Sequence, residues 1–314
     1  MSARALGLLL GYAADRVWAD PVRHHPVAWF GTVASRLEQR VWRDDRLAGT
    51  AYAAVLVGGV VLPAAGAERR AGPATRVVTT AAATWLVLGG TSLDREAAAV
   101  QARLAVDDLP GARTQVGRIV GRSTADLDAA GVARAAVESV AENTSDAVVG
   151  ALVWGAVAGL PGLLGFRAAN TLDAMVGHRT ARHDRFGWAG ARLDDVLGLP
   201  GARLTAALAA AAGPDHAGAL RAWRRDAGAH PSPNAGPVEA AFAGALGVTL
   251  GGPTTYGDRT EDRPRLGDGA APTAHDVTRA RRLAARVGLG AAVVSALIAV
   301  RAPTPPLPPR RPRR

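Results

Sequence analysis

The sequence contains no cysteine and no lysine, and all 37 of its basic side chains are arginine. The absence of cysteine excludes disulfides, thiolate nucleophiles and cysteine-based zinc sites. The absence of lysine excludes a Schiff-base lysine and the lysine of a P-loop. Any phosphate group must therefore be held by arginine, by backbone N–H groups or through a metal ion.

Aromatic residues make up only 4% of the chain, although 48% of its residues are hydrophobic. Small apolar residues supply most of this mass, as in bundles of membrane helices, where they allow close packing. The formal net charge of +10 suits an anionic lipid surface. The arginines are spread along the chain with few aromatics beside them, so the pattern predicts membrane lipid, and no nucleic acid, as a partner.

Four long apolar runs are candidates for membrane spans, at residues 51–66, 77–93, 147–166 and 284–300. Two shorter runs, 203–213 and 237–252, predict core or interfacial helices. There is no repeat and no useful alternating strand pattern. The sequence therefore predicts an all-α, polytopic integral membrane protein in which polar helical segments and loops form the site. We expect one membrane-embedded domain over 1–300 and a disordered Pro/Arg-rich tail at 301–314, on the cytoplasmic side.

The third run has the same arginine load on both flanks. Residues 94–146 and 167–203 carry six arginines each, whereas a single crossing favours arginine on the cytoplasmic flank. The run also contains Gly159-Leu-Pro-Gly162, which should break a helix. We therefore expect a re-entrant hairpin or a broken, protein-buried helix that leaves both flanks on one side of the membrane.

The stretch ESVAENTSD, residues 138–146, holds three carboxylates directly before this run. Glu138, Glu142 and Asp146 recur every four residues, so they share one face of a continuous helix. Like charges at this spacing repel by about 0.2–0.5 kcal/mol, and Mg²⁺ or arginine would offset that repulsion. The alternative is a helix junction in which the residues from Asn143 to Asp146 act as N-caps and the glutamates are solvated.

Two further motifs carry oxygen ligands and arginine. Asn170 and Asp173 lie one helical turn apart, and hard oxygen ligands at that spacing suit Mg²⁺. In the second motif, an arginine fork can bind phosphate through two hydrogen bonds. The alternatives are a polar surface helix and an interfacial helix with ion pairs. The second motif contains Arg185, Arg192, Asp194 and Asp195.

The stretch HPSPNAG, residues 230–236, cannot form a regular helix. Its two prolines, with Ser232 and Asn234, predict a rigid polar loop, and such loops often carry binding groups. His230 can act as a base, a ligand or a hydrogen-bond donor, or it can simply fix the turn. Residues 251–256, which begin with two glycines, predict another loop where the backbone can approach a ligand.

The ordered set of motifs closely resembles the CobD/CbiB family of cobalamin biosynthesis. The resemblance rests on DPVRHHPV, ESVAENTSD, NTLDAMVG, FGWAGARLDD, HPSPNAG, LGGP and GDG, and runs from about residue 7 to about residue 285. It implies an all-α, multi-pass membrane protein assigned as an adenosylcobinamide-phosphate synthase. Such an enzyme joins aminopropanol, or its phosphate, to a propionate carboxylate of adenosylcobyric acid. The sequence departs from the family pattern in two places, at Pro237 and in the charged segment after LGGP. Neither departure removes a polar residue of the motifs.

The resemblance supports the positions of the site, and the chemistry suggests roles. Making an amide from a carboxylate and an amine needs an activated acyl group, so we expect Mg²⁺ and ATP as cofactors and an adenosylated corrinoid as substrate. We assign Mg²⁺ to Glu142, Asp146 and Asp173. We assign cofactor binding to Arg185, Arg192, Asp194 and Asp195, with the two arginines binding phosphate. We assign amine binding and supporting roles to His230, Ser232, Asn234, Glu138, Asn143 and Asn170.

The predicted partners are adenosylcobyric acid, aminopropanol phosphate, membrane lipid and other cobalamin-pathway enzymes. The predicted location is the cell membrane, with the active site in the cytoplasm. A membrane transporter for a corrinoid or a metal ion is the alternative function, and a scaffold for pathway enzymes is a third. A transporter predicts charges within spans and inverted repeats. The polar motifs lie outside the apolar runs and no repeat is found, which favours the enzyme.

Overall fold

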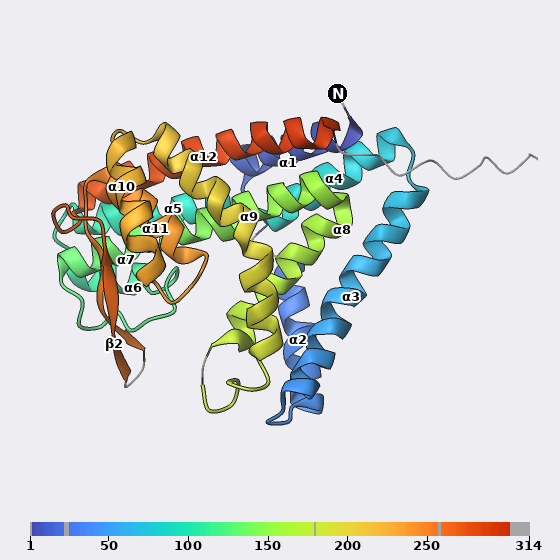
Figure 1. Ribbon diagram of the computed structural model, residues 1–314, viewed down its shortest axis with the longest axis horizontal. Helices are drawn as coiled ribbons and strands as arrows, with labels where there is room; N and C mark the ends of the chain where they lie inside the picture. The colour runs from blue at the N-terminus through green and yellow to red at the C-terminus, as the bar shows by residue number, and fades with distance from the viewer. Residues whose placement is uncertain (1, 22–24, 179, 257–258, 302–314) are drawn as a thin grey trace, which may run out of the picture. The chain divides into compact units, whose positions relative to one another are not determined.

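The computed structural model is almost entirely helical (Figure 1) and describes residues 2–21, 25–178, 180–256 and 259–301. The predicted all-α class is confirmed, with one β-hairpin in the described chain as the exception. The predicted disordered tail lies outside these residues after Arg301. In chain order the elements are α1 (Ala3–Trp18), α2 (Pro26–Val41), α3 (Arg46–Arg70), α4 (Pro73–Val87), α5 (Gly90–Leu104), α6 (Leu109–Val116), α7 (Ala129–Thr144), the π-turn η1 (Ser145–Val149), α8 (Gly150–Leu172), the π-turn η2 (Asp173–Gly177), α9 (Trp188–Ala212), α10 (His216–Asp226), the 3-10 turn η3 (Ala227–Ala229), α11 (Ala235–Leu246), β1 (Leu250–Tyr256), β2 (Arg259–Leu266) and α12 (Ala274–Arg301).

The chain divides into two compact units. Unit 1 takes the described residues within Met1–Leu88, Gly150–Leu197 and Ala292–Arg314, and unit 2 takes those within Gly89–Val149 and Gly198–Ala291. In unit 2, α11 is buried along its whole length and packs against α10 and α7. The expectation of a single membrane-embedded domain stays a prediction.

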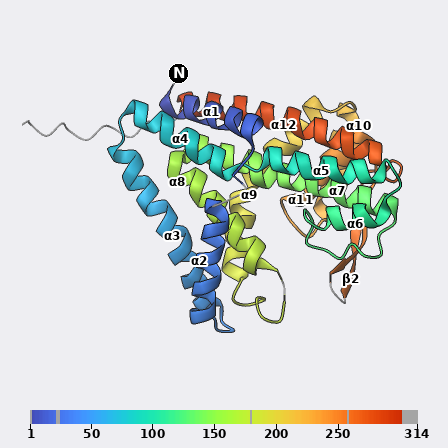
Figure 2. The same ribbon diagram turned by 180° about the vertical axis from the view of Figure 1, so that it is seen from behind.

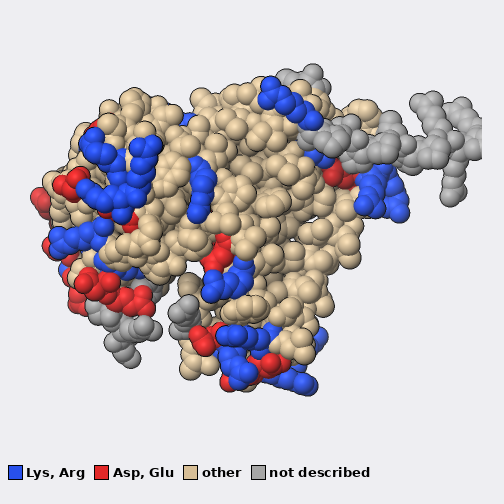
Figure 3. All heavy atoms as spheres, viewed as in Figure 1, with Lys and Arg blue, Asp and Glu red and all other residues tan. Residues whose placement is uncertain are grey.

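Helix α3 has the properties of a membrane span. Its 25 residues make a rod of about 37 Å, enough to cross a hydrocarbon core of about 30 Å. Only 28% of its most apolar window is buried inside the protein, and side chains such as Leu62 are exposed. Charged side chains gather at both ends of α3 and leave an uncharged surface between them (Figure 3). A helix that is apolar on its exposed faces is suited to lipid.

Three helical segments among the described residues are long and apolar enough to cross a membrane: Arg46–Arg70, Ala129–Gly177 and Ala274–Arg301. They contain three of the four predicted spans. The predicted span at 77–93 is wrong, because α4 ends at Val87 and α5 begins at Gly90. Leu88 and Gly89 separate the two helices. Gly89 and Gly90 stand side by side at this break, and glycine is a poor helix former because it loses the most backbone entropy on folding.

Close packing of small residues joins α1 to α4 in unit 1. Gly7 and Gly11 of α1 are four residues apart and lie against Thr80 and Thr84 of α4. A Cβ atom on Gly7 would come within 2.6 Å of the Thr80 Cβ, so only glycine allows this approach. Such small-residue contacts are typical of helix pairs in membranes, where van der Waals packing drives association.

Helix α8 doubles back at Gly159 (Figure 1 and Figure 2). Gly159 has φ 68° and ψ −150°, which is not helical. A Cβ atom on Gly150 would collide with the Phe166 ring, and one on Gly155 would lie 3.3 Å from Leu163. In a straight helix, positions 150 and 166 would be about 24 Å apart. The predicted break is therefore confirmed, and it takes the form of a helical hairpin.

The tip of the α8 hairpin is closed by a buried ion pair from two other helices. Pro161 has no N–H group, so it cannot donate to the Val157 carbonyl one turn earlier. Arg4 of α1 donates to the carbonyl oxygens of Ala156 at 3.2 Å and Val157 at 3.4 Å. Its guanidinium also donates to Glu68 of α3 at 3.4 Å. Arginine thus replaces the backbone donors that the break removes.

The β-hairpin of unit 2 was not expected from the sequence. Strands β1 and β2 pair antiparallel, with a bulge between Leu250 and Gly252. The predicted loop at 251–256 and the last part of the predicted helix at 237–252 are therefore wrong, because this stretch forms β1. Gly251 and Gly252 have φ of 79° and 86°. Glycine in a strand often marks a bulge, because it tolerates positive φ and close approach of other groups.

Candidate functional site

Two of the predicted metal ligands stand at the beginning of π-helical turns. Asp146 is the second residue of η1, and Asp173 is the first residue of η2. Single π-turns within helices are rare and frequently lie at functional sites. Helical backbone continues from α7 through η1, and the Thr144 hydroxyl donates back to the Val140 carbonyl at 2.6 Å. The alternative of a helix junction with N-caps at 143–146 therefore does not apply.

Glu138 is a buried anchor within unit 2. One oxygen of its carboxylate forms an ion pair with Arg122, and the other accepts a hydrogen bond from the Gly251 N–H at 2.7 Å. Arg122 also donates to the Thr254 hydroxyl at 3.2 Å. Both oxygens of Glu138 therefore attach α7 to the loop at 122 and to β1. This arrangement suits the supporting role predicted for Glu138.

One turn further along α7, Glu142 stands at a small cavity of about 90 Å³. We call it the carboxylate cavity. Glu142 is exposed on the solvent side, whereas Glu239 of α11 is buried. Three carboxyl groups and two guanidinium groups line the cavity. The charged residues that line the cavity are Glu138, Glu142, Glu239, Arg122 and Arg263.

Glu239 lies beside His230, from the predicted rigid loop. The His230 Nδ1 accepts a hydrogen bond from the Ser232 N–H at 3.0 Å, so the neutral ring carries its proton on Nε2. That Nε2 is buried, has no hydrogen-bond partner in the described chain, and lies 3.9 Å from a Glu239 carboxyl oxygen. The two side chains are only 3% and 4% exposed, so water is largely excluded from them.

Burial shifts the protonation of this pair in opposite directions. Burial raises the pKa of the Glu239 carboxyl well above its usual range, and the charges of Glu138 and Glu142 raise it further. Burial lowers the pKa of the His230 imidazole, and the positive charge of Arg263 lowers it further. Both groups therefore favour their neutral forms. With Glu239 neutral, two glutamates face two arginines and the cavity charge is balanced; an ionised Glu239 adds one negative charge.

The other polar residues of the 230–234 loop hold its shape. The Ser232 hydroxyl accepts hydrogen bonds from the N–H groups of Asn234 at 3.2 Å and Ala235 at 3.1 Å, which begins α11. The Asn234 side chain accepts from Arg203 at 3.3 Å. Asn143, on α7, donates to the Ser139 carbonyl at 2.9 Å. The predicted irregular loop is thus confirmed, and its serine and asparagine side chains form hydrogen bonds that hold its conformation.

In unit 1 the motifs at 170–177 and 184–195 come together. The Asn170 amide donates to Asp194 at 3.3 Å, and the charges of His178 and Asp195 act on Asp173. Three carboxylates and one amide are the oxygen donors that suit Mg²⁺. Within the described ranges, no three His, Asp or Glu side chains are already arranged to hold a metal ion. Mg²⁺ commonly needs only one or two carboxylates in addition to substrate phosphates.

The two arginines predicted to bind phosphate are paired with carboxylates on the surface of unit 1. Arg192 donates to Asp195 at 3.2 Å. Arg185 lies 4.0 Å from Asp44, and both of those side chains are more than half exposed. Exposed pairs of this kind are weak and exchange readily with solvent, because water screens the charges. Their assignment to the cofactor stays a prediction.

Several residues of the carboxylate cavity escaped the sequence interpretation. Glu239 is the only charged residue between positions 235 and 250, and an isolated charge in an apolar run is a usable signal because burying it is unfavourable. Arg122 and Arg263 carried no such signal. Each lies in a polar segment among other charges, and only the fold brings them to Glu138 and Glu239.

Comparison with known proteins agrees with the resemblance noted in the sequence. A sequence model of a family described as CobD/Cbib protein matches residues 8–284. The chain is similar to "Cobalamin biosynthesis protein CobD" of Mycobacterium tuberculosis, with 51% identity over 302 residues, covering 95% of this chain and 96% of that protein. It is 46% identical over 283 residues to the protein of the same name from Rhodobacter capsulatus, covering 88% and 90% of the two chains. No solved structure matches the chain.

Proposed function

Because the chain belongs to the CobD/CbiB family, we propose that it acts in cobalamin biosynthesis as a carbon–nitrogen ligase. In this proposal it joins aminopropanol, or aminopropanol phosphate, to a propionate carboxylate of adenosylcobyric acid through an amide bond. The observation that carries the proposal is the 51% identity, over nearly the whole chain, to a protein named for cobalamin biosynthesis. The match runs over 302 residues and covers 95% of this chain.

The carboxylate cavity supports this reaction class. An amine must lose a proton before its nitrogen can attack an acyl carbon, so the site needs a general base near the amine. Glu239 and His230 are buried together, and burial keeps both neutral until a proton is taken up or released. The ionised form of Glu239 is a stronger base than an ordinary carboxylate. In this proposal Glu239 first releases its own proton to solvent, and His230 Nε2–H donates a hydrogen bond to the carboxylate so formed; that carboxylate then accepts the ammonium proton and becomes a carboxylic acid again.

Activation of the propionate is assigned to Mg²⁺ and ATP, which when bound would supply the phosphoryl or nucleotidyl group that turns a propionate oxygen into part of a leaving group. The chain offers oxygen ligands and arginines for them, and it has no cysteine or lysine for a covalent acyl intermediate. We propose Glu142, Asp146 and Asp173 as the residues that hold the metal. Arg185, Arg192 and the neighbouring Asp194 and Asp195 would hold and orient the nucleotide.

The proposal is tested with the purified full chain in detergent. Adenosylcobyric acid, aminopropanol phosphate and Mg-ATP are supplied together, and the amide product is sought by mass spectrometry. Parallel reactions omit ATP, or replace aminopropanol phosphate by aminopropanol. We expect the amide only in the presence of ATP. The absence of amide with either amine, from protein shown to be folded, would contradict the proposed reaction.

We also propose that the protein spans the membrane more than once, supported by the long apolar helices and by the α8 hairpin. Single cysteines at Ala125 and Ala181, both exposed, should react with an impermeant thiol reagent from the same side, because their flanks carry equal arginine loads. A cysteine at Gly72, between α3 and α4, should react from the other side. The chain has no other cysteine, so the labelling is unambiguous. Labelling of Ala125 and Ala181 from opposite sides would refute this topology.

A further inference from the structure

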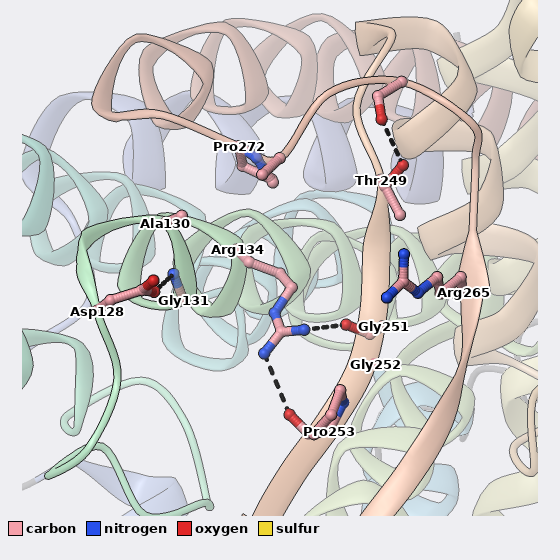
Figure 4. A pocket seen from close by; sticks show the side chains of 12 residues that line it. Asp128, Ala130, Gly131, Arg134, Thr249, Gly251, Gly252, Pro253, Arg265 and Pro272 are labelled. Atoms are coloured by element: carbon pink, nitrogen blue, oxygen red, sulfur yellow. Dashed lines mark hydrogen bonds between the residues drawn. The ribbon is translucent and has the colours of Figure 1, made fainter.

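A second cavity in unit 2 is not used by the assignments above. It has a volume of about 310 Å³ and is lined by residues of α7, the β-hairpin and the segment before α12 (Figure 4). Two arginines, Arg134 of α7 and Arg265 of β2, reach it from different elements. We call it the arginine pocket. It combines positive charge with a concave space that is partly open to solvent, and both features suit an anionic ligand.

Arg134 is fixed in place without losing its charge. Its guanidinium donates to the carbonyl oxygens of Gly251 and of Pro253, the latter at 3.1 Å. Both acceptors are neutral, and no carboxylate pairs with Arg134 in the described chain. A guanidinium has five N–H groups, so donors remain after these two bonds. A fixed, uncompensated arginine with donors to spare is prepared for an anion, because little side-chain freedom is lost on binding.

The two glycines of β1 allow the Arg134 guanidinium to approach the backbone of the strand. At Gly252, φ is 86° and a Cβ atom would lie 2.8 Å from the Arg134 Nη1. A side chain at this position would fill the space beside the guanidinium. The LGGP motif, which the sequence interpretation treated as a loop, thus serves to bring the backbone and Arg134 together at the wall of the pocket.

The charges around the pocket favour a doubly negative group. Arg265 is exposed and has no ion-pair or hydrogen-bond partner in the part of the chain that the structure describes. The one carboxylate of the lining, Asp128, accepts a hydrogen bond from the Gly131 N–H at 2.7 Å, where it caps α7. Two arginines against one engaged carboxylate leave a net positive charge. Paired guanidinium groups bind phosphate with both charge and directed hydrogen bonds.

We propose that the arginine pocket binds the phosphomonoester group of a small substrate, with Arg134 and Arg265 as its direct ligands. The volume lies near the lower limit for small-molecule pockets, about 300 Å³, which suits a short phosphorylated compound. Resting on the proposed function, we identify the compound as the phosphorylated amino alcohol. Gly251 connects the two cavities, because its N–H donates to Glu138 and its carbonyl accepts from Arg134. The phosphate would then lie in the arginine pocket and the amine at the carboxylate cavity.

The test is a binding measurement on the full chain in detergent, without corrinoid, so that no turnover occurs. Isothermal calorimetry compares aminopropanol phosphate, aminopropanol and ATP. We expect aminopropanol phosphate to bind at least about tenfold more tightly than aminopropanol. Arg265→Gln should weaken that binding about 10- to 100-fold, because a hydrogen bond to a charged group contributes about 1.5–3 kcal/mol. The substitution should leave folding unchanged, since Arg265 is exposed and unpaired.

Arg224→Gln is the matched control. Arg224 is an exposed arginine of α10 outside the pocket, so this variant makes the same charge change and should bind as wild type. Gly252→Ala, which crowds Arg134, should weaken binding as Arg265→Gln does. If Arg265→Gln weakens ATP but not aminopropanol phosphate, the pocket binds phosphate from the nucleotide and the amino alcohol assignment is overturned. If Arg265→Gln and Gly252→Ala bind all three compounds as wild type does, the pocket is not a phosphate site.

This experiment is independent of the proposed reaction. Tight binding of aminopropanol phosphate with no amide formed would contradict the proposed reaction and support the phosphate site in the arginine pocket. Amide formation that is unaffected by Arg265→Gln at limiting aminopropanol phosphate would support the reaction and contradict the phosphate site.

Discussion

Replacing Glu142 by Gln, Asp146 by Asn or Asp173 by Asn should each lower amide formation by at least about tenfold, with the protein still folded in the membrane. Each change keeps the shape of the side chain and removes one negative charge. Even the outer-shell partners of a metal site typically contribute about 10- to 100-fold to affinity or activity, so loss of a direct ligand should do at least as much. Stability should change little for Glu142→Gln, since Glu142 is exposed and such substitutions usually stay within about 0.5 kcal/mol. Asp146 and Asp173 are half-buried, so the folding of those two variants is measured beside their activity.

The measurement is the rate of amide formation as a function of Mg²⁺ concentration. A weakened metal site should recover part of its rate at high Mg²⁺, whereas a misfolded protein should not. Asp126→Asn is the control, because Asp126 is an exposed carboxylate in the loop before α7. Near wild-type rates for all three variants at ordinary Mg²⁺ would show that these carboxylates do not hold the metal. If one variant keeps the wild-type rate, its carboxylate is not a metal ligand and the other two remain as the proposed ligands.

The largest effect on stability should come from Gly159→Ala. Its φ of 68° and ψ of −150° lie in a region that is essentially open only to glycine, and strain there is about 1–3 kcal/mol for other residues. A Cβ atom would also overlap the Glu68 carboxylate and lie 2.8 Å from the Arg4 guanidinium. Disturbing a buried ion pair adds about 3–5 kcal/mol. We expect a loss of at least about 3 kcal/mol, measured by denaturant unfolding in detergent.

Gly58→Ala provides the comparison within the same unit. Gly58 lies inside α3, and a Cβ atom there would meet nothing within 4 Å. Alanine in a helix interior is about 0.5–1 kcal/mol more favourable than glycine, so this variant should be as stable as wild type or more so. Equal stability of the two variants would mean that the hairpin tip is not constrained as described.

Patterns of apolar residues and helix breakers were sufficient for much of the fold. The apolar runs within α3 and α12 and the break at Gly159-Leu-Pro-Gly162 appear where the sequence predicted them. The prediction of a span at 77–93 was wrong because the run is apolar across Gly89-Gly90, and hydrophobicity alone does not reveal where a helix ends. The β-hairpin was not predicted because β1 begins with Leu-Gly-Gly-Pro and β2 is highly charged, so neither strand shows alternating apolar and polar residues.

Local motifs were sufficient to predict some of the site residues, whereas others are brought together only by the fold. The motifs identified the helical stretch with Glu138 and Glu142 and the rigid loop at His230, and the fold brings Glu138, Glu142 and Glu239 to one cavity. The sequence interpretation missed Glu239 and the arginines because their role depends on contacts between distant segments. The π-turns at Asp146 and Asp173 were also beyond it, because a π-turn and an α-turn use the same residue types.

The closure of the α8 hairpin by Arg4 and Glu68 has a consequence for biogenesis. The carbonyl groups at the hairpin tip lack backbone donors, and in lipid each unsatisfied group would be unfavourable by several kcal/mol. The hairpin therefore cannot reach its final structure before α1 and α3, which supply Arg4 and Glu68, are in position. Both helices precede α8 in the chain, so they are synthesised before the segment that packs against them. A circular permutant that begins between α7 and α8 reverses this order of synthesis.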